Sequence, residues 1–266
     1  MAGPDTFYTD HWKAIEPDRL ARYEQMFVWR SEQARLLEPA AIAKGHRVLD
    51  LGSGPGFLSL AIGDMVGPSG AVHGVDINAR FVADARARAA DRAATHVTFH
   101  HVDGPTLPFG DGSHDRVIAK NVLEYVPDLA ATLAEAARVL APGGKLHAID
   151  SDWGFVIVEP WGKATVDRFF TAAAPAFREP YIGRKLPAAF NGAGLVDIEV
   201  RLLPTVDRTG ALLSVLRNMR SYIRTFRSMP DAEVDDLIAA AERAVSDGTY
   251  TACLPQFLVT GTRPKS

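Results

Sequence analysis

The sequence predicts an α/β fold built on a mostly parallel β-sheet with helices on both faces. Between about residues 47 and 150, short apolar segments alternate with amphipathic segments of helical length. Three of the apolar segments end at or next to an aspartate, and the first runs directly into a turn with three glycines. Ligands bind beyond the carboxyl ends of the strands in such sheets, so the same features indicate where a site lies.

Residues 9–44 precede the first expected strand and have helical character. Leu20, Tyr23 and Phe27 recur at the spacing of one helix face, and a second apolar set follows at 34–41. We expect residues 1–44 to form an N-terminal helical lid.

The central segment predicts five strands with helices between them. The strands are expected at residues 48–51, 72–76, 97–102, 116–120 and 145–150. The helices are expected at residues 57–65, 79–93 and about 129–140. Glycine and proline at 67–70 and 142–144 end the first and third of these helices.

The alternation is looser beyond residue 150. We expect a long aromatic loop, a helix at 185–191, a strand at 195–203, helical sequence over 207–247 and a last strand at 257–262. A helical insertion so late in the chain predicts a cap over the site rather than an independent domain. The expected organisation is a lid (1–44), a core (45–204), a cap insertion (205–250) and a last strand with a tail (251–266).

Composition excludes several classes of protein. The 266 residues are 47% hydrophobic with a net charge of −3, which gives no general attraction to nucleic acid or to an anionic membrane. The single cysteine, Cys253, excludes an internal disulfide and a multi-cysteine metal site. No basic and apolar leader or 18-residue apolar segment is evident, so we expect a cytoplasmic location and no stable membrane insertion.

The glycine turn is the most informative motif. Gly52, Gly54 and Gly56 follow a strand that carries Asp50, and such a turn lets a ligand approach the backbone closely. The dinucleotide fingerprint needs a glycine where Phe57 stands, so a nicotinamide-dependent oxidoreductase is disfavoured. A turn that collects glycine only for its backbone conformation is the alternative.

A second acid follows the glycine turn at the sequence separation expected for a nucleotide-binding fold. Asp76 comes 20 residues after Gly56, where nucleotide-binding α/β folds place the carboxylate that accepts hydrogen bonds from ribose hydroxyls. A further acid, Asp103, follows the third expected strand. Three acids around one site repel phosphates more than they repel a zwitterionic amino-acid nucleoside. The alternative for each acid is a turn former or a helix cap.

Three further segments complete a family pattern. They are Phe109–Ile118, Asn121–Asp128 and Arg138–Gly144, and with the glycine turn they cover residues 45–150 in order. The pattern resembles class I S-adenosylmethionine (SAM)-dependent methyltransferases, of the type of the ubiquinone and menaquinone enzymes, although the N-terminal signatures of those enzymes are not evident. The resemblance implies a Rossmann-like seven-stranded sheet whose last strand is antiparallel. It also implies SAM as cofactor and S-adenosylhomocysteine (SAH) as product.

The resemblance assigns cofactor-binding residues one by one. The turn residues Asp50, Gly52, Ser53, Gly54 and Gly56 are expected around the methionine part, and Asn121 and Val122 beside it. Asp76 is expected on the ribose, Ile77 against the adenine, and Asp103 with Gly104 at its amino group. Tyr23 and Arg30 are expected on helices that fold over the cofactor, the alternative for Arg30 being an exposed helical side chain.

Large aromatic side chains flank the core and predict the acceptor site. All four tryptophans and five of six tyrosines lie outside residues 45–150. Expected substrate contacts are Tyr8, Trp12, Trp29, Tyr125 and Trp153, which would form an apolar chamber. The alternative is that they only hold the cap to the sheet. Methyl transfer from a sulfonium is an in-line displacement that depends on alignment more than on a general base. Where a base is used, the candidate catalytic residues are Asp152, His100 and His11, with His101 and Glu124 also considered.

The expected partner is a small organic molecule methylated on oxygen, nitrogen or carbon. Signatures of nucleic-acid and protein-arginine methyltransferases are missing, so we expect no nucleic-acid partner. A row of arginines, Arg217, Arg220, Arg224 and Arg227, is interpreted as the solvated face of an amphipathic helix rather than a site for anions. The oligomeric state is left open, a homodimer being one option. A protein that binds SAM without transferring its methyl group is the second alternative.

Overall fold

The structure is a computed structural model that describes residues 6–13, 15, 20, 23 and 26–265. Part of the expected N-terminal helical segment, and the last residue of the tail, lie outside the described residues. A short helix, α1 (Phe7–Lys13), and two 3₁₀ helices, η1 (Ser31–Leu36) and η2 (Glu38–Ala40), precede the first strand. Pro39 lies in η2, where its missing N–H prevents the long helix that the apolar set at 34–41 suggested.

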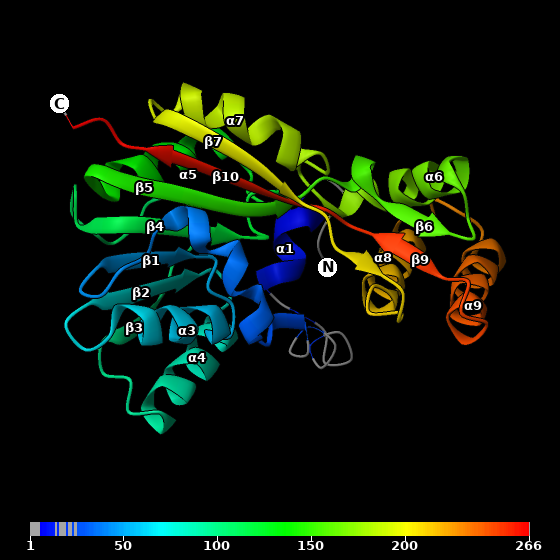
Figure 1. The fold of residues 1–266 in the computed structure, drawn as a ribbon, viewed down its shortest axis with the longest axis horizontal. Helices are drawn as coiled ribbons and strands as arrows, with labels where there is room; N and C mark the ends of the chain where they lie inside the picture. The colour runs from blue at the N-terminus through cyan, green and yellow to red at the C-terminus, as the bar shows by residue number, and fades with distance from the viewer. Residues whose placement is uncertain (1–5, 14, 16–19, 21–22, 24–25, 266) are drawn as a thin grey trace.

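A seven-stranded sheet forms the centre of the molecule, in the order β3-β2-β1-β4-β5-β10-β7 (Figure 1). Its strands are β1 (Arg47–Leu51), β2 (Ala71–Asp76), β3 (Val97–His101), β4 (His114–Lys120), β5 (Leu140–Ser151), β7 (Val196–Leu203) and β10 (Gln256–Thr262). Strands β1 to β5 pair in parallel, whereas β10 is antiparallel to both of its neighbours. The predicted fold class is confirmed, including the antiparallel last strand.

Helices cover both faces of this sheet. Helices α3 (Phe57–Val66) and α4 (Ala79–Asp91) lie on one face, and α5 (Leu129–Val139) and α7 (Ile182–Gly192) on the other. Neighbouring strand residues alternate between the two layers: Val48 packs with α3 and α4, and Leu49 packs with α5 and α7. Side-chain caps fix two helix starts, since Asn78 accepts from Arg80 N and Phe81 N, and Asp128 accepts from Ala131 N.

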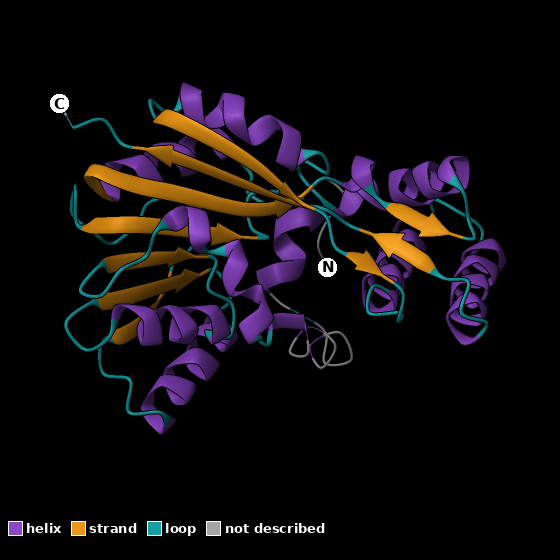
Figure 2. Cartoon of the chain, viewed as in Figure 1, coloured by secondary structure: helices purple, strands orange, loops and turns teal. Residues whose placement is uncertain are grey.

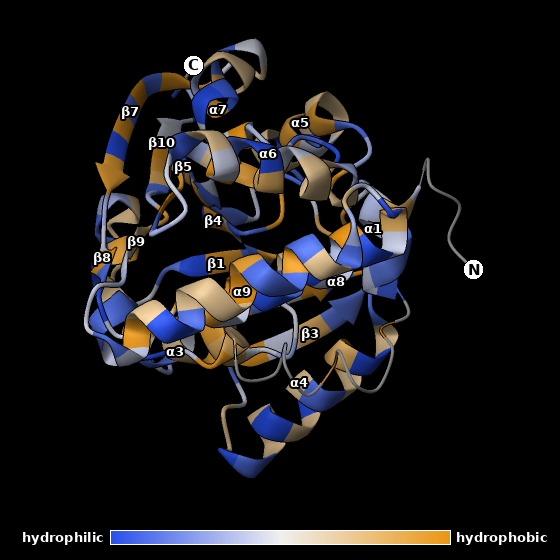
Figure 3. Cartoon of the chain, turned by 90° about the vertical axis from the view of Figure 1, so that its right-hand side faces the viewer, coloured by the Kyte–Doolittle hydropathy of each residue, from blue (hydrophilic) through white to orange (hydrophobic). Residues whose placement is uncertain are grey.

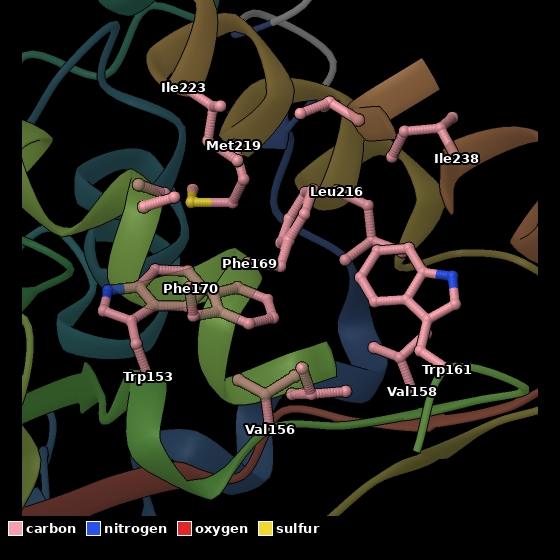
Figure 4. Close-up of a cluster of buried hydrophobic side chains, with 14 of the residues drawn as sticks. Trp153, Val156, Val158, Trp161, Phe169, Phe170, Leu216, Met219, Ile223 and Ile238 are labelled. Carbon is pink, nitrogen blue, oxygen red and sulfur yellow. The ribbon is translucent and has the colours of Figure 1, made fainter. Parts of the chain in front are cut away.

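A second, smaller lobe forms the cap (Figure 2). It contains a three-stranded sheet of β6 (Ile157–Glu159), β9 (Thr251–Cys253) and β8 (Val206–Asp207), in that order. Around it lie the helices α6 (Lys163–Ala173), α8 (Leu213–Phe226) and α9 (Asp231–Ser246), with the 3₁₀ helices η3 (Trp153–Phe155) and η4 (Ala174–Ala176). This lobe has its own hydrophobic cluster, in which Trp153 stacks on Phe170 beside Met219 and Ile223 of α8 (Figure 4).

The cap is assembled from two separate stretches of chain, about 153–177 and 206–253. The sequence led us to expect only the second, at 205–250, and a loop in place of the first. Strand β6 has three residues, too few to show alternation, whereas α6 carries Val166, Phe169, Phe170 and Ala173 at helical spacing and was detectable.

The arginine row on α8 faces another helix as well as solvent. Arg217 pairs with Glu242, Arg220 with Asp235, and Arg224 with Asp231 and Asp235, all of these acids lying on α9. Figure 3 shows α9 across the front of the molecule, with hydrophilic and hydrophobic residues alternating along it. The row is therefore largely neutralised by α9, which corrects the interpretation of a purely solvated face.

Core and cap are joined by a two-stranded ribbon. Strand β7 leads into β8, and β9 leads into β10, so both connections run side by side (Figure 1). Leu203 pairs with Gln256 and Val206 pairs with Cys253, so the register continues across the gap and places Pro204 opposite Pro255. Proline has no N–H to donate, which explains why the ladder is interrupted at this level.

Candidate active site

A cavity of about 560 Å³ lies beyond the carboxyl ends of β1, β2 and β4, between the sheet and the cap. Its floor is the glycine turn and the ends of the strands. The described N-terminal residues contribute Trp12, Tyr23 and Phe27, and the cap contributes Val215, Asn218 and Met219 of α8. With Leu254 and Gln256 also in the lining, the cavity is thus bounded by residues from all four expected parts of the chain.

The glycine turn has the geometry of a ligand seat. Gly52, Gly54 and Gly56 all have positive φ, at 71°, 52° and 86°. A Cβ on Gly52 would lie 2.3 Å from Val122 Cγ2, and one on Gly56 would lie 2.8 Å from Ala85 Cβ, so these two positions are filled by the protein itself. A Cβ on Gly54 meets nothing within 4 Å. Gly54 therefore borders open cavity space that a ligand can occupy.

Asp76 closes the turn from the neighbouring strand. Its Oδ2 accepts from Gly54 N at 2.7 Å and its Oδ1 accepts from Asn78 N at 2.8 Å. Burial raises the pKa of Asp76, while the hydrogen bonds from Asn78 and Gly54 oppose the shift. Each carboxylate oxygen retains a further lone pair, so Asp76 can still accept from two hydroxyls.

Buried charges lie side by side at the ends of β1, β4 and β5. Burial raises the pKa of Asp50 to about 7, although Ser59 donates to its Oδ2. Burial likewise raises the pKa of Asp150 to about 7 and lowers the pKa of Lys120, whose charge interacts with both acids. One cation between two partly protonated acids limits the net charge beneath the cavity.

Glu124 lies on the wall of the cavity that faces the cap. The indole Nε1 of Trp153 donates to its Oε2 at 2.8 Å, and the side chain of Glu124 is 2% exposed. Burial, reinforced by the charge of Asp150, raises the pKa of Glu124 well above its ordinary value. The surroundings of Glu124 therefore favour its neutral form over the carboxylate.

The N-terminal residues are tied to both other parts. Trp12 stacks on Tyr23 with ring centroids 4.9 Å apart, and its carbonyl accepts from Asn78 Nδ2 at 2.7 Å. The hydroxyl of Tyr23 lies 2.9 Å from that of Tyr222 on α8. These contacts hold aromatic rings over the cavity.

Unpartnered polar atoms concentrate in this cavity. Among the described residues, four buried side-chain nitrogen or oxygen atoms have no hydrogen-bond partner. Three of them belong to residues that line the cavity, namely Trp12 Nε1, Ser53 Oγ and Asn218 Oδ1. Buried polar groups are nearly always paired, so this clustering indicates a site for a polar ligand.

The structure brings most of the expected site residues together. Those that line the cavity are Trp12, Tyr23, Trp29, Asp50, Gly52, Ser53, Gly54, Asp76, Ile77, Asp103, Gly104, Asn121, Val122, Tyr125 and Trp153. Their individual roles stay predictions. Asp103 keeps an 86% exposed side chain, 3.4 Å from His101 Nε2, and so lies at the rim.

Six expected site residues do not line the cavity: Tyr8, His11, Arg30, Gly56, His100 and Asp152. Asp152 is buried and is held by the guanidinium of Arg184 through two hydrogen bonds of 2.6 and 2.7 Å. His11 stacks on Phe7, and the ring of Tyr8 lies against the guanidinium of Arg178. His100 packs edge-on against Phe109 beside His73.

The sequence reasoning missed Lys120 and Asn218, which line the cavity, and Asp150, whose charge interacts with Lys120. Lys120 and Asp150 end expected strands, so their position carried a usable signal. Asn218 is one of several polar residues of an amphipathic helix, and nothing in the sequence shows that it lines a cavity.

Comparisons with known proteins are consistent with this geometry. A family model described as a methyltransferase domain matches residues 42–174. An uncharacterized 37.1 kDa protein in transposon TN4556 of Streptomyces fradiae is 32% identical over 250 residues, which cover 92% of this chain and 66% of that protein. A demethylmenaquinone methyltransferase of Anoxybacillus flavithermus is 29% identical over 143 residues, covering 54% and 58%. The chain therefore spans about two thirds or less of the length of these two relatives.

A solved structure extends the likeness to the whole fold. The phosphoethanolamine N-methyltransferase 2 of Haemonchus contortus, in complex with SAM, superposes with a TM-score of 0.64 at 18% identity. The superposition covers 97% of this chain and 60% of that one. At this identity the match shows the fold alone.

Proposed function

This chain belongs to the family of class I SAM-dependent methyltransferases, and we propose that it transfers a methyl group from SAM to a small organic acceptor. The observation that carries the proposal is the glycine turn. Gly54 borders open space, Ser53 Oγ is buried without a partner, and Asp76 lies beside both. These groups suit a ligand with hydroxyls and an amino-acid end.

The residues that would hold SAM follow from this arrangement. Asp76 would accept from the ribose hydroxyls, and Ser53 would meet the methionine part with the backbone of Gly52 and Gly54. Asp103 and Ile77 stay the proposed adenine contacts. When bound, SAM supplies an electrophilic methyl group on its sulfonium. Acidic residues outnumber lysines in the lining, with Asp50, Asp76 and Asp103 at the strand ends, which favours a cationic cofactor over a pyrophosphate.

The chain's own contribution to the reaction is enclosure and alignment. Aromatic side chains of Trp12, Tyr23, Tyr125 and Trp153 wall the cavity and exclude water. Holding an acceptor in line with the methyl group supplies on the order of 7–11 kcal/mol of the barrier. The expected bases Asp152, His100 and His11 do not line the cavity, so we propose a reaction that depends on alignment rather than on any of them.

A small acceptor is proposed because the cavity is covered. The cap lies over the end of the sheet, and α8 contributes three residues to the cavity wall. Among the described residues no helix is long and apolar enough to cross a bilayer. A demethylated quinol, the acceptor that the name of one relative implies, is one candidate among small aromatic molecules.

Calorimetry tests the cofactor half of the proposal. We expect the protein to bind SAM and SAH and not NADH; binding of NADH alone would support the oxidoreductase alternative. Asp76→Ala should weaken SAH binding about 10- to 100-fold, because a hydrogen bond to a charged group contributes about 1.5–3 kcal/mol. Asp76→Asn keeps an acceptor for the Gly54 N–H. Weaker SAH binding by this variant would therefore report lost ribose contacts rather than a disordered turn. Asp84→Asn on the exposed face of α4 is the control.

Product analysis tests the transfer half. SAH should accumulate together with a methylated product when the protein is incubated with SAM and an accepted substrate. If a substrate is converted with no SAH formed, the protein uses SAM without transferring its methyl group.

A further inference from the structure

We propose that Asn218 of α8 recognises a hydroxyl group on the acceptor, and that the acceptor is a neutral, otherwise apolar alcohol or phenol. The inference deepens the proposed function, because it assigns a substrate class to the half of the cavity opposite the SAM seat. Neither the family pattern nor any expected site residue pointed to Asn218.

Asn218 is a buried amide without a partner. Its side chain is 7% exposed, it lines the cavity, and its Oδ1 meets no hydrogen-bond donor among the described residues. A buried polar group in that state is costly unless a ligand or an ordered water completes it. The other α8 residues that line the cavity, Val215 and Met219, are apolar, so Asn218 is the polar residue that α8 contributes to this lining.

A second unpartnered group, the indole N–H of Trp12, also lines the cavity. Asn218 and Tyr222 are four residues apart on α8 and therefore share a face. The hydroxyl of Tyr222 meets that of Tyr23, on which Trp12 stacks. The indole N–H of Trp12 is itself buried without a partner and lines the cavity. Two of the unpartnered buried atoms of the described residues thus lie along this chain of contacts, an acceptor, Asn218 Oδ1, and a donor, Trp12 Nε1.

This pair matches a hydroxyl better than a charged group. A hydroxyl both donates and accepts a hydrogen bond, so it can pair with a group of either kind, the amide oxygen or the indole N–H. Neither the Asn218 amide nor the Trp12 indole carries a charge. They therefore offer no counter-ion to a phosphate or an ammonium group on a ligand. The surrounding wall, with Val215, Met219, Leu254 and Trp153, suits an apolar and preferably flat remainder of the molecule.

The first test is the thermal stability of the ligand-free protein. Asn218→Leu replaces the amide by an apolar side chain of similar size. Because the amide has no protein partner, we expect Tm to stay the same or to rise by about 2–4 °C. A clear fall in Tm would show that Asn218 serves the fold and would overturn the inference. Asn191→Leu, on the exposed end of α7, is the matched control.

The second test measures recognition with two probes of the same shape. The SAH-saturated protein is titrated with 4-ethylphenol and with 4-ethyltoluene, which carries a methyl group in place of the hydroxyl. We expect the wild type to bind the phenol about 10-fold more tightly or better, and Asn218→Leu to reduce that preference to about 3-fold or less, with Trp12 supplying the remainder. A third probe, 4-ethylbenzoate, should bind more weakly than the phenol.

The outcomes separate this inference from the proposed function. If SAH binds but the wild type shows no preference for the phenol, or Asn218→Leu keeps the full preference, the inference fails and the proposed function stands. If SAH does not bind, the proposed function fails, while the Tm of Asn218→Leu still decides whether the amide serves the fold. Tighter binding of the benzoate would overturn the neutral substrate class.

Discussion

The indole nitrogen of Trp153 donates a hydrogen bond of 2.8 Å to Oε2 of Glu124, and both side chains are buried against the cavity. Trp153 begins the first stretch of the cap, and Glu124 follows the fourth strand of the core. One hydrogen bond therefore joins the two lobes at the wall of the site.

Replacing Glu124 tests this junction. Glu124→Ala leaves the Trp153 N–H buried and unpaired, which should cost about 2–3 kcal/mol of unfolding free energy. Glu124→Gln keeps an acceptor oxygen for the indole N–H and carries no charge, which suits a site whose burial raises the pKa of Glu124, and it should change stability by less than about 1 kcal/mol. Urea denaturation at pH 7 measures the free energy of unfolding of both variants. Equal losses in the two variants would show that the acceptor oxygen is not what stabilises this junction.

The glycine turn gives a prediction that separates folding from binding. Gly54→Ala places a Cβ in open cavity space at a φ of 52°, so it should cost about 1–2 kcal/mol of stability but weaken SAH binding at least 10-fold. Gly52→Ala drives a Cβ to 2.3 Å from Val122 Cγ2 and should lower stability much more. Gly192→Ala, with no atom within 4 Å and no positive φ, is the control. Unchanged SAH affinity in Gly54→Ala would remove the turn from the cofactor site.

Asp152 is expected to act in the fold rather than in the reaction. Its carboxylate is fully buried and accepts hydrogen bonds from Nε and Nη2 of Arg184. Asp152→Asn should therefore lower the unfolding free energy by about 2 kcal/mol while kcat with an accepted substrate changes only a few-fold. Denaturation measures the change in unfolding free energy, and initial rates of SAH formation measure the change in kcat. A rate loss of about 100-fold in a protein of normal stability would instead restore Asp152 as a catalytic candidate.

His147 makes the protein sensitive to acid. Thr260 Oγ1 and the carbonyl of Leu36 each lie 2.8 Å from its ring nitrogens, and burial lowers its pKa from 6.5 to about 4. The imidazole of His147 binds a proton more readily in the unfolded chain than in the folded one. Its contribution to the free energy of unfolding is therefore fully present above pH 6.5 and is lost as the pH falls toward 4. The loss reaches at most about 3 kcal/mol.

The measurement is a pair of stability profiles between pH 4 and 7. The profile of His147→Gln should decline less steeply than that of the wild type below pH 6.5, and the two should run parallel above it. Subtracting the profile of the variant from that of the wild type cancels the titration of Asp50 and Asp150. Their raised pKa values make the folded state less stable as the pH rises over this range, which is opposite to the effect of His147. Identical slopes below pH 6.5 would show that His147 is not buried in its neutral form.

The sequence was sufficient where local chemistry decides the structure. The glycine turn, Asp76 and the alternation from residue 47 to 150 predicted the sheet and a set of residues that line the cavity. The cap was harder, because β6 has three residues and the two stretches of the cap are about 30 residues apart in the chain. Lys120 ends an expected strand and could have been found, whereas Asn218 owes its place in the cavity to tertiary packing, which no periodicity records. Asp152 lies beside Trp153 in the chain, yet the η3 turn directs it to Arg184 and away from the cavity.

The ribbon between core and cap has a consequence for substitutions at the site. Pro204 and Pro255 interrupt its ladder at one level, and the residues on either side of Pro255, Leu254 and Gln256, line the cavity. The chain therefore leaves the cap for the core sheet at the edge of the cavity. A substitution of Leu254 or Gln256 alters the junction of the lobes and the wall of the site together.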